Sequence, residues 1–381
     1  GIVMSDWTST YTTLGCVEGG LDLEMPEGYW LNYDMVKELM DNGIIRESQI
    51  DRKCVNILKT FMRFGLFDRS SVDATLPENN PECNRIAYEV ALEGPVLLKN
   101  DDILPLSRKR MKNIAVIGPN SDIIPFGGGS GEVSLMDGEG VTLLDGIREM
   151  AGAQNVTHVA IDESLEFDEA TIKKASVVIV SAGYTKKTER EGSDRTFHLP
   201  DGQDSLIFKI AGLNSNVIVI VNSGGEVAMP WLDEVKAVIL DWYPGQEGGR
   251  VLADLISGKV SPCGRLPFTF WGSEEANPSY PYYAKRENKI VPEKRDRFFH
   301  TVYYEGVFSG YRGMEHFGRT PLFPFGYGLT YSDFGYSDLE VMSAGNGYDV
   351  TFTVRNNGKY AASDVPQIYV TECSPEVPRP D

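Results

Sequence analysis

Histidine and cysteine are scarce in this sequence, which has 381 residues, four histidines and five cysteines. No cysteine forms a C-x-x-C pair or lies at a metal-ligand spacing from a histidine, so we expect no metal site and no cofactor. No serine stands in a G-x-S-x-G motif, which argues against a hydrolase built on that nucleophile. The odd, scattered cysteines do not describe a disulfide framework, and they leave the redox compartment open.

Positive charge is also in deficit, because 36 lysines and arginines face 55 acidic residues, for a formal net charge of −19. Such a surface repels phosphate backbones, so we expect no nucleic-acid partner. No run approaches the ~20 apolar residues that cross a bilayer, so we expect no membrane span. The sequence does not indicate an oligomeric state. Its composition is that of a globular protein, and its charge suits one that acts on neutral molecules.

The chain is longer than one compact core usually supports, so we expect two or three domains. Residues 1–5 read as a short buried strand leading into Asp6 and Trp7, and apolar spacing predicts helices at 33–42 and 49–64. This series is α/β in character but too short to close a sheet, and an unpaired sheet edge leaves backbone groups unsatisfied. The first residue is not a methionine. We therefore expect further strands before it.

A polar segment with two prolines, residues 70–84, reads as a linker, and residues 85–270 then alternate strands and helices. Strands are predicted at 114–117, 156–160, 176–181, 217–221 and 237–240, with helices at 85–98, 143–150, 166–174, 203–213, 227–233 and 246–257. This alternation predicts an α/β sandwich with a mostly parallel sheet covered on both faces.

The last part of the chain changes character twice. Residues 271–331 are an irregular, tyrosine-rich connecting segment that we expect to wrap over the earlier domains. Within residues 332–381, apolar and polar residues alternate at 348–355 and again at 366–371, with a turn signal, Asn356-Asn357-Gly358, between them. This pattern predicts the start of a small β-sandwich with too few strands to bury a core.

The loop at residues 183–200 leaves the end of the predicted strand 176–181 and carries Glu189 and Glu191 among several basic residues. Ligands bind at the carboxyl ends of strands in open α/β sheets. Asp6 also follows a predicted strand, and Trp7 offers a flat apolar face of the kind that sugars pack against. Two carboxylates facing one bond suit glycoside hydrolysis. The alternatives are that the loop is solvated surface, that Asp6 caps a turn and that Trp7 is core.

Two glycine-rich segments allow other interpretations. Residues 127–131 (GGGSG) follow a strand as a phosphate loop does, but no Lys-Ser/Thr follows and no helix opens on them. A loop lining a polar pocket, or a plain turn, is therefore favoured over a nucleotide-dependent enzyme. Residues 245–249 (GQEGG) predict tight helix–strand packing, with Glu247 near the positive end of the helix.

Several segments occur in an order that resembles glycoside hydrolase family 3, the β-glucosidase-type family. They are residues 3–7 (VMSDW), 20–26 (GLDLEMP), 96–100 (VLLKN) with 104–106 (LPL), 127–131 (GGGSG), 191–195 (EGSDR) with 199–200 (LP), 245–247 (GQE), 264–267 (GRLP) and 323–331 (FPFGYGLTY). The resemblance covers nearly the whole chain. It implies that residues 1–69 are the C-terminal part of a (β/α)₈ barrel and that residues 332–381 begin a fibronectin type III-like domain.

The same resemblance implies a retaining exo-β-glycosidase, foremost a β-glucosidase, with Asp6 as nucleophile, Glu191 as general acid/base and Trp7 as a wall of the leaving-group subsite. The site would lie between two domains, Glu191 would need a raised pKa, and basic neighbours would point away from it. Glu189 is the rival acid.

With most of a barrel missing, we expect the chain alone to be inactive. A β-xylosidase, another family 3 exo-glycosidase and a catalytically silent carbohydrate-binding relative stay open. The expected partners are small β-glycosides or oligosaccharides, and a secreted or periplasmic location is favoured by the resemblance.

Overall fold

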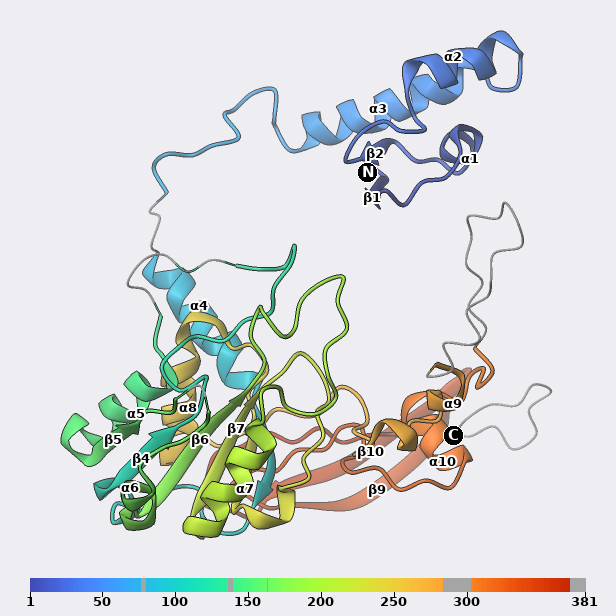
Figure 1. The fold of residues 1–381 in the computed structure, drawn as a ribbon. Coiled ribbons are helices and arrows are strands. Elements are labelled where there is room, and N and C mark those ends of the chain that lie inside the picture. Colours follow the sequence, from blue (N-terminus) through green and yellow to red (C-terminus); the bar gives the residue numbers. More distant parts are fainter. Residues whose placement is uncertain (77–79, 134, 136–139, 163, 284–302, 371–381) are drawn as a thin grey trace. The chain divides into compact units, whose positions relative to one another are not determined.

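The computed structural model describes residues 1–76, 80–133, 135, 140–162, 164–283 and 303–370, and it forms two compact units, Gly1–Asn80 and Pro81–Asp381. Figure 1 shows the helices and strands of each unit. Within the described residues, no helix is long and apolar enough to cross a membrane.

The first unit holds two short parallel strands and three helices: β1 (Met4–Trp7), α1 (Thr13–Glu18), β2 (Leu23–Met25), α2 (Tyr33–Asp41) and α3 (Glu47–Arg63). The two predicted helices are confirmed. The strand is shifted, because Asp6 and Trp7 lie inside β1 and not after it. The expected burial is wrong: Met4 is 58% and Trp7 65% exposed, since β1 pairs with β2 in a sheet of two strands.

Lys53 ties the helices of this unit together. Its side chain is buried, and its Nζ donates to the carbonyl oxygens of Cys16, Val17 and Leu21 at 3.1, 3.3 and 2.5 Å. The last carbonyls of a helix have no partner within the helix, and a cation there is favoured by the helix dipole. Lys53 on α3 therefore fixes the end of α1.

The predicted linker and first helix of the next unit need correction. Helix α4 (Pro81–Glu93) begins inside the predicted linker, and the predicted helix 85–98 ends early because residues 96–100 form a strand, β3 (Val96–Asn100). Proline suits the first position of a helix, which explains the start at Pro81. Pro95 disfavours helical geometry at Gly94, which explains the end.

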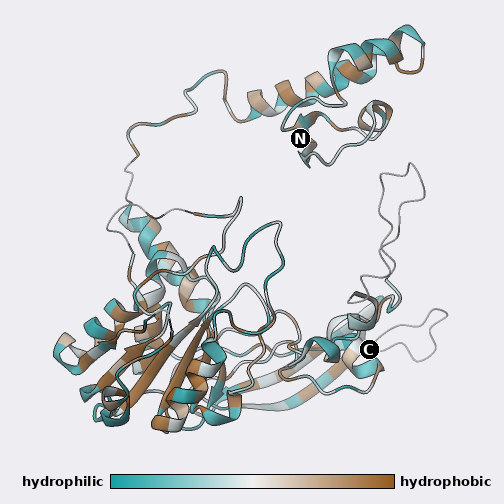
Figure 2. Ribbon diagram, viewed as in Figure 1, coloured by the Kyte–Doolittle hydropathy of each residue, from teal (hydrophilic) through white to brown (hydrophobic). Residues whose placement is uncertain are grey.

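The second unit is built on a sheet of six strands in the order β3-β8-β7-β6-β4-β5, parallel except for β3 against β8. The other strands are β4 (Ile114–Ile117), β5 (Val156–Val159), β6 (Val177–Gly183), β7 (Val217–Asn222) and β8 (Ala237–Leu240). Figure 2 shows this sheet as the most hydrophobic part of the ribbon. The predicted α/β class and mostly parallel sheet are confirmed.

Helices cover both faces of the sheet, which is why its strands are continuous apolar runs. Side chains of α5 (Leu143–Ala151) and α8 (Gly248–Ser257) pack on one face with Ile114 and Val116, while those of α6 (Glu169–Lys174) and α7 (Gln203–Leu213) pack on the other with Ala115 and Ile117. Short helical turns complete the unit: η1 (Arg110–Lys112), η2 (Ala153–Asn155), η3 (Leu232–Glu234), η4 (Gly245–Glu247), η5 (Glu274–Ala276), α9 (Tyr280–Tyr283) and α10 (Gly310–His316).

Two further predictions in this unit are wrong. The predicted helix 227–233 is absent: residues 227–229 are buried but have no regular secondary structure, and the turn η3 follows. Pro230 disfavours helical geometry at Met229, which explains the difference. Residues 245–249 were predicted to pack a helix against a strand, but Gly249 packs α8 against the start of α5.

The packing of α5 against α8 shows why glycine is needed there. A Cβ on Gly249 would lie 1.9 Å from the Thr142 carbonyl oxygen, and one on Gly146 would lie 2.0 Å from that of Gly249.

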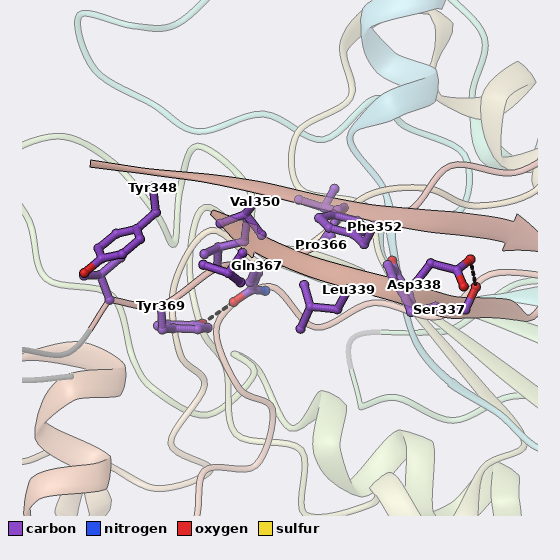
Figure 3. Close-up of a pocket in the computed structure, with 14 residues that line it drawn as sticks. Ser337, Asp338, Leu339, Tyr348, Val350, Phe352, Pro366, Gln367 and Tyr369 are labelled. Atoms are coloured by element: carbon purple, nitrogen blue, oxygen red, sulfur yellow. Dashed lines mark hydrogen bonds between the residues drawn. The ribbon is translucent and has the colours of Figure 1, made fainter. Parts of the chain in front are cut away.

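The chain then forms a hairpin, β9 (Phe334–Ala344) antiparallel to β10 (Gly347–Asn356), which confirms the predicted strand 348–355. The predicted strand 366–371 is wrong for 366–370, which do not pair, and residue 371 lies outside the described part. Instead, Pro366 and Tyr369 line an apolar hollow of about 1000 Å³ together with Leu339 and Val350 of the hairpin (Figure 3). An alternating pattern becomes a strand only where a neighbouring strand is available to it.

Candidate active site

Two loops meet at one edge of the second unit's sheet (Figure 1). Strand β4 has β5 on one side and β6 on the other. The chain therefore runs from β4 toward one edge of the sheet and from β6 toward the other, so the strand order reverses between β4 and β6. The loop after β4 carries the glycine-rich residues 127–131, and the loop after β6 carries Glu189 and Glu191. Open α/β sheets bind ligands at such a reversal, outside the carboxyl ends of the strands.

The two loops are joined by their backbones. The N–H of Gly128 donates to the carbonyl oxygen of Glu189 at 2.9 Å, and the N–H of Glu191 donates back to that of Gly128 at 3.1 Å. Together they line a pocket of about 480 Å³ with Gly127, Gly128, Glu189, Arg190, Glu191, Ser193, Asp194, Arg195 and Tyr243. The glycine-rich loop thus lines a polar pocket, as one of its sequence interpretations predicts.

Glu189 is an anchor of the loop. Its Oε2 accepts hydrogen bonds from the Tyr243 hydroxyl at 2.6 Å and the Gly224 N–H at 3.0 Å, and its Oε1 lies 3.2 Å from Nε of Arg195. The side chain is 19% exposed. Burial and the Glu189 carboxylate raise the pKa of Tyr243. Both oxygens of Glu189 are therefore occupied by the protein itself.

Arg195 carries this anchoring into the interior. Its Nη2 donates to the carbonyl oxygen of Glu226 at 2.6 Å, and its guanidinium lies over the buried Tyr184 ring, 5.1 Å from the centroid. Lys186 pairs instead with Glu132 at 2.9 Å. Among the described residues, no lysine or arginine forms an ion pair with Glu191.

Glu191 itself is exposed at the pocket. Its Oε2 accepts a hydrogen bond from the Ser130 N–H at 2.7 Å and another from the Ser130 hydroxyl. These bonds favour the charged carboxylate and lower the pKa of Glu191. The expected raised pKa is therefore wrong for this chain, because two hydrogen bonds from Ser130 to one carboxylate oxygen stabilise the charged form.

Two buried carboxyls follow the ends of β7 and β8. Glu226 is 4% exposed, its Oε1 accepts from the Gly272 N–H at 2.7 Å, and burial raises its pKa to about 7. Asp241, at the end of β8, accepts from the Asn222 amide at 3.3 Å, and burial raises its pKa well above the ordinary value. Both carboxyls favour the neutral form where a surface carboxylate would be charged.

Asp6 and Trp7 belong to the first unit and Glu191 to the second, so their pairing stays a prediction. Asp6 is exposed, and its Oδ1 accepts from the Trp7 N–H at 2.7 Å. The Asp6 carbonyl also accepts from the Ser9 N–H at 3.4 Å, so Asp6 does begin a turn. The alternative that Trp7 is core does not hold in this unit, since its side chain is largely exposed.

The second unit also resembles known proteins in its sequence. Residues 95–331 match the sequence profile of the glycosyl hydrolase family 3 C-terminal domain. This chain belongs to glycosyl hydrolase family 3. It is 35% identical over all of its length to thermostable β-glucosidase B of Acetivibrio thermocellus, and 32% identical over all of its length to an exo-α-(1→6)-L-arabinopyranosidase of Bifidobacterium longum.

A solved structure in the same family, a GH3 β-glucosidase from Bifidobacterium adolescentis, matches with a TM-score of 0.79 at 31% identity, over 94% of this chain and 52% of that one. This chain spans about half the length of the curated relatives it matches. It covers 50% of the Acetivibrio thermocellus protein and 50% of the Bifidobacterium longum protein.

Sequence reasoning missed several residues of this candidate site. Tyr243 lies just beyond the end of β8, at Leu240, which is a signal that could have found it. Glu226 is an acid beside the apolar residues 227–229, which could have indicated burial. Ser130 was seen only as part of a glycine-rich loop. No signal indicated that it contacts Glu191, because the two are 61 residues apart.

The three histidines that the structure describes lie outside the lining of this pocket. His158 lies 3.1 Å from the Ser121 hydroxyl, His198 lies 3.0 Å from Asp204, and His316 stacks on Phe308. The fourth, His300, is outside the described residues. Across the described ranges, no group of His, Cys, Asp or Glu is arranged to hold a metal ion.

Proposed function

We propose that this chain is part of a retaining exo-β-glycosidase that hydrolyses terminal non-reducing β-D-glucosyl residues of small glycosides. Glu191 is the general acid/base, Asp6 the nucleophile and Trp7 a sugar-contacting side chain. The observation that carries the assignment of the acid is the contrast between two glutamates of one loop. Both oxygens of Glu189 are bonded to the protein, whereas Glu191 is exposed at a pocket at the reversal point of the sheet.

The proposed reaction has two displacements at one carbon. The Asp6 carboxylate attacks the anomeric carbon as the glycosidic C–O bond breaks, and Glu191 gives its proton to the departing oxygen. Glu191, now a carboxylate, takes a proton from water, whose oxygen attacks the same carbon and releases Asp6. Two inversions give net retention, and the two carboxyl groups must stand about 5–5.5 Å apart in the active protein.

A second candidate is an exo-glycosidase of the same mechanism with another sugar. One 32% identical relative is named for an L-arabinopyranosyl substrate, and the proposed carboxylates act on the anomeric carbon whichever sugar carries it. Glucosides, xylosides and arabinopyranosides with one aryl leaving group separate these specificities by their kcat/KM.

The test uses a chimera, in which this chain is joined to the half of the Acetivibrio thermocellus relative that it does not match. The chimera should cleave aryl β-D-glucosides and release β-glucose first, as seen by proton NMR of the anomeric signals. Asp6→Asn should abolish cleavage, and Trp7→Ala should raise KM. We expect the 381-residue chain alone to be inactive, since β1 pairs with only one strand in the described part of its unit.

Two results would overturn the proposal. Release of α-glucose first would contradict retention. Binding of glucose without turnover, in a folded chimera that retains Asp6 and Glu191, would favour a catalytically silent carbohydrate-binding protein.

A further inference from the structure

The glycine-rich loop holds the Glu191 side chain by one of its oxygens. The Ser130 N–H and the Ser130 hydroxyl both donate to Oε2 of Glu191. No described residue donates a hydrogen bond to Oε1, and Glu191 lines the pocket. The two oxygens of one carboxyl group therefore have different surroundings: one is fixed to the protein, and the other is free.

The glycines of this loop permit the contact. Gly129 has a φ of +103°, and a Cβ built on it would lie 2.4 Å from Cβ and 3.0 Å from Oε2 of Glu191. A Cβ on Gly128 would lie 2.8 Å from the carbonyl oxygen of Lys186. No side chain fits at either position without moving the loop at residues 183–200. At Gly129, a φ near +100° is also strained for any residue but glycine. The two adjacent glycines thus let the loops approach closely enough for Ser130 to reach Glu191.

We propose that residues 127–131 form a seat for the Glu191 carboxyl group, and that Ser130 is a positioning residue that fixes Oε2 and leaves Oε1 to carry the transferred proton. The inference rests on the proposed function, because it gives Oε1 the role of donor to the departing oxygen. It assigns a task to the GGGSG segment that its sequence alone does not indicate.

Among the groups near the seat, Ser130 has the main influence on the pKa of Glu191. Its charged neighbours are used elsewhere, since Lys186 pairs with Glu132 and Arg195 with Glu189. The other ionisable residues that line the pocket are Arg190, Asp194 and Tyr243. The two hydrogen bonds from Ser130 favour the ionised carboxylate.

The direction of the pH effect follows from these bonds. The acid step needs protonated Glu191, so kcat/KM falls as pH rises through the pKa of Glu191. Removing the Ser130 hydroxyl removes a bond that lowers this pKa, and the basic limb of the profile should move to higher pH. Loss of orientation should at the same time lower kcat and leave KM nearly unchanged.

The first experiment needs no catalysis and uses the 381-residue chain. The ¹³Cδ chemical shift of Glu191, assigned by its absence in Glu191→Gln, is titrated against pH in the wild type, Ser130→Ala, Ser130→Thr and Ser193→Ala. The midpoint should rise in Ser130→Ala and return toward the wild-type value in Ser130→Thr, which keeps a hydroxyl. It should not move in Ser193→Ala, the matched control from the same pocket. Equal midpoints in the wild type and Ser130→Ala would overturn the proposal.

A second measurement does not depend on the folding of Ser130→Ala. Hydrogen exchange of the Ser130 amide should be faster in Glu191→Ala than in the wild type, because the acceptor is lost. Unchanged exchange would also overturn the seat.

The pH profile of the chimera then separates the seat from the proposed function. A basic limb that moves upward in Ser130→Ala supports both, and an unmoved limb contradicts the seat. If Glu191→Gln keeps full activity while the NMR midpoints shift as described, the seat exists but Glu191 is not the acid.

Discussion

Glu189 and Glu191 are two residues apart on one loop, yet their side chains differ in burial and in hydrogen bonding. Glu189 is largely buried, and the Tyr243 hydroxyl, the Gly224 N–H and the Arg195 guanidinium occupy its two oxygens. Glu191 is exposed, and Ser130 holds only one of its oxygens. The surroundings of the first resemble those of a structural ion pair, and those of the second leave an oxygen available to a substrate.

If Glu191 is the proposed acid, one short loop combines a fixed side chain with a reactive one. A general acid must be held in place by groups that do not use up the oxygen that transfers the proton. Here the bonds that give rigidity are concentrated on Glu189 and Arg195, and the backbone bonds between Gly128 and the two glutamates bring the neighbouring loop to the same place. Four predictions concern these two glutamates and the groups near them, from the largest expected effect to the smallest.

The largest effect should come from Glu191→Gln in the chimera. Proton donation by a positioned side chain contributes about 10²–10⁴-fold, so kcat/KM should fall by that factor on glucosides with poor leaving groups. It should fall far less on 2,4-dinitrophenyl glucoside, whose leaving group needs no proton. An equal loss on both substrates would mean that Glu191 does not act as the acid.

The buried carboxyl of Glu226, whose backbone carbonyl binds Arg195, should make the stability of the protein depend on pH. The pKa of Glu226 is raised to about 7, above its ordinary 4.5, so the folded state binds more protons between these values. The free energy of unfolding should therefore fall as pH rises from about 4.5 to about 7 and should then level off. By linkage, Glu226→Gln should remove a fall on the order of 3 kcal/mol.

Urea unfolding of the 381-residue chain at pH 5 and pH 8 measures this difference. Glu234→Gln, at an exposed site, serves as the control and should leave the pH dependence as it is. If the wild type and Glu226→Gln lose equal stability over this range, the Glu226 carboxyl is not protonated in the folded protein.

Glu189 should contribute to the stability of the fold, whereas Glu191 should contribute little. Glu189→Gln weakens the bonds to Arg195, Gly224 and Tyr243 and should lower the free energy of unfolding by about 1–3 kcal/mol. Glu191→Gln and the surface-pair control Glu132→Gln should change it by less than about 1 kcal/mol. Thermal unfolding of the 381-residue chain measures all three, and equal destabilisation by Glu189→Gln and Glu191→Gln would break the comparison.

Tyr243→Phe should give the smallest effect, because Glu189 keeps its bonds to Gly224 and Arg195. Loss of one hydrogen bond should cost about 1 kcal/mol of stability, with Tyr348→Phe, at a 70% exposed site, as the control. The loop should also become more open to trypsin at Arg190. Unchanged stability and an unchanged cleavage rate would show that Tyr243 does not help to hold the loop.

Much of the fold could be predicted because its signals are local. The strands of the sheet are runs of valine and isoleucine buried on both faces, and such runs read as parallel strands without any knowledge of their neighbours. The errors arose where tertiary context decided. Residues 227–229, before Pro230, are buried without forming a helix, and residues 366–370 alternate without a strand to pair with.

The site was predictable in part for the same reason. A charged loop at the end of a strand can be found in the sequence, and so can the candidates Asp6 and Glu191. The groups that distinguish Glu189 from Glu191 cannot, because Tyr243 is 54 residues from Glu189 and Ser130 is 61 from Glu191. Their contacts exist only once β4, β6 and β8 lie in one sheet.

The division of roles between the two glutamates can be tested most directly by chemical rescue. The chimeras Glu191→Ala and Glu189→Ala are incubated with 2,4-dinitrophenyl β-D-glucoside and sodium azide, and the products are identified by NMR. If Glu191 is the acid/base, its removal leaves a space at the glycosyl-enzyme intermediate. Azide, which needs no general base, then attacks the anomeric carbon and yields β-glucosyl azide. We predict this product and a faster turnover with azide for Glu191→Ala, and neither for Glu189→Ala. Formation of β-glucosyl azide by Glu189→Ala and not by Glu191→Ala would contradict the assignment.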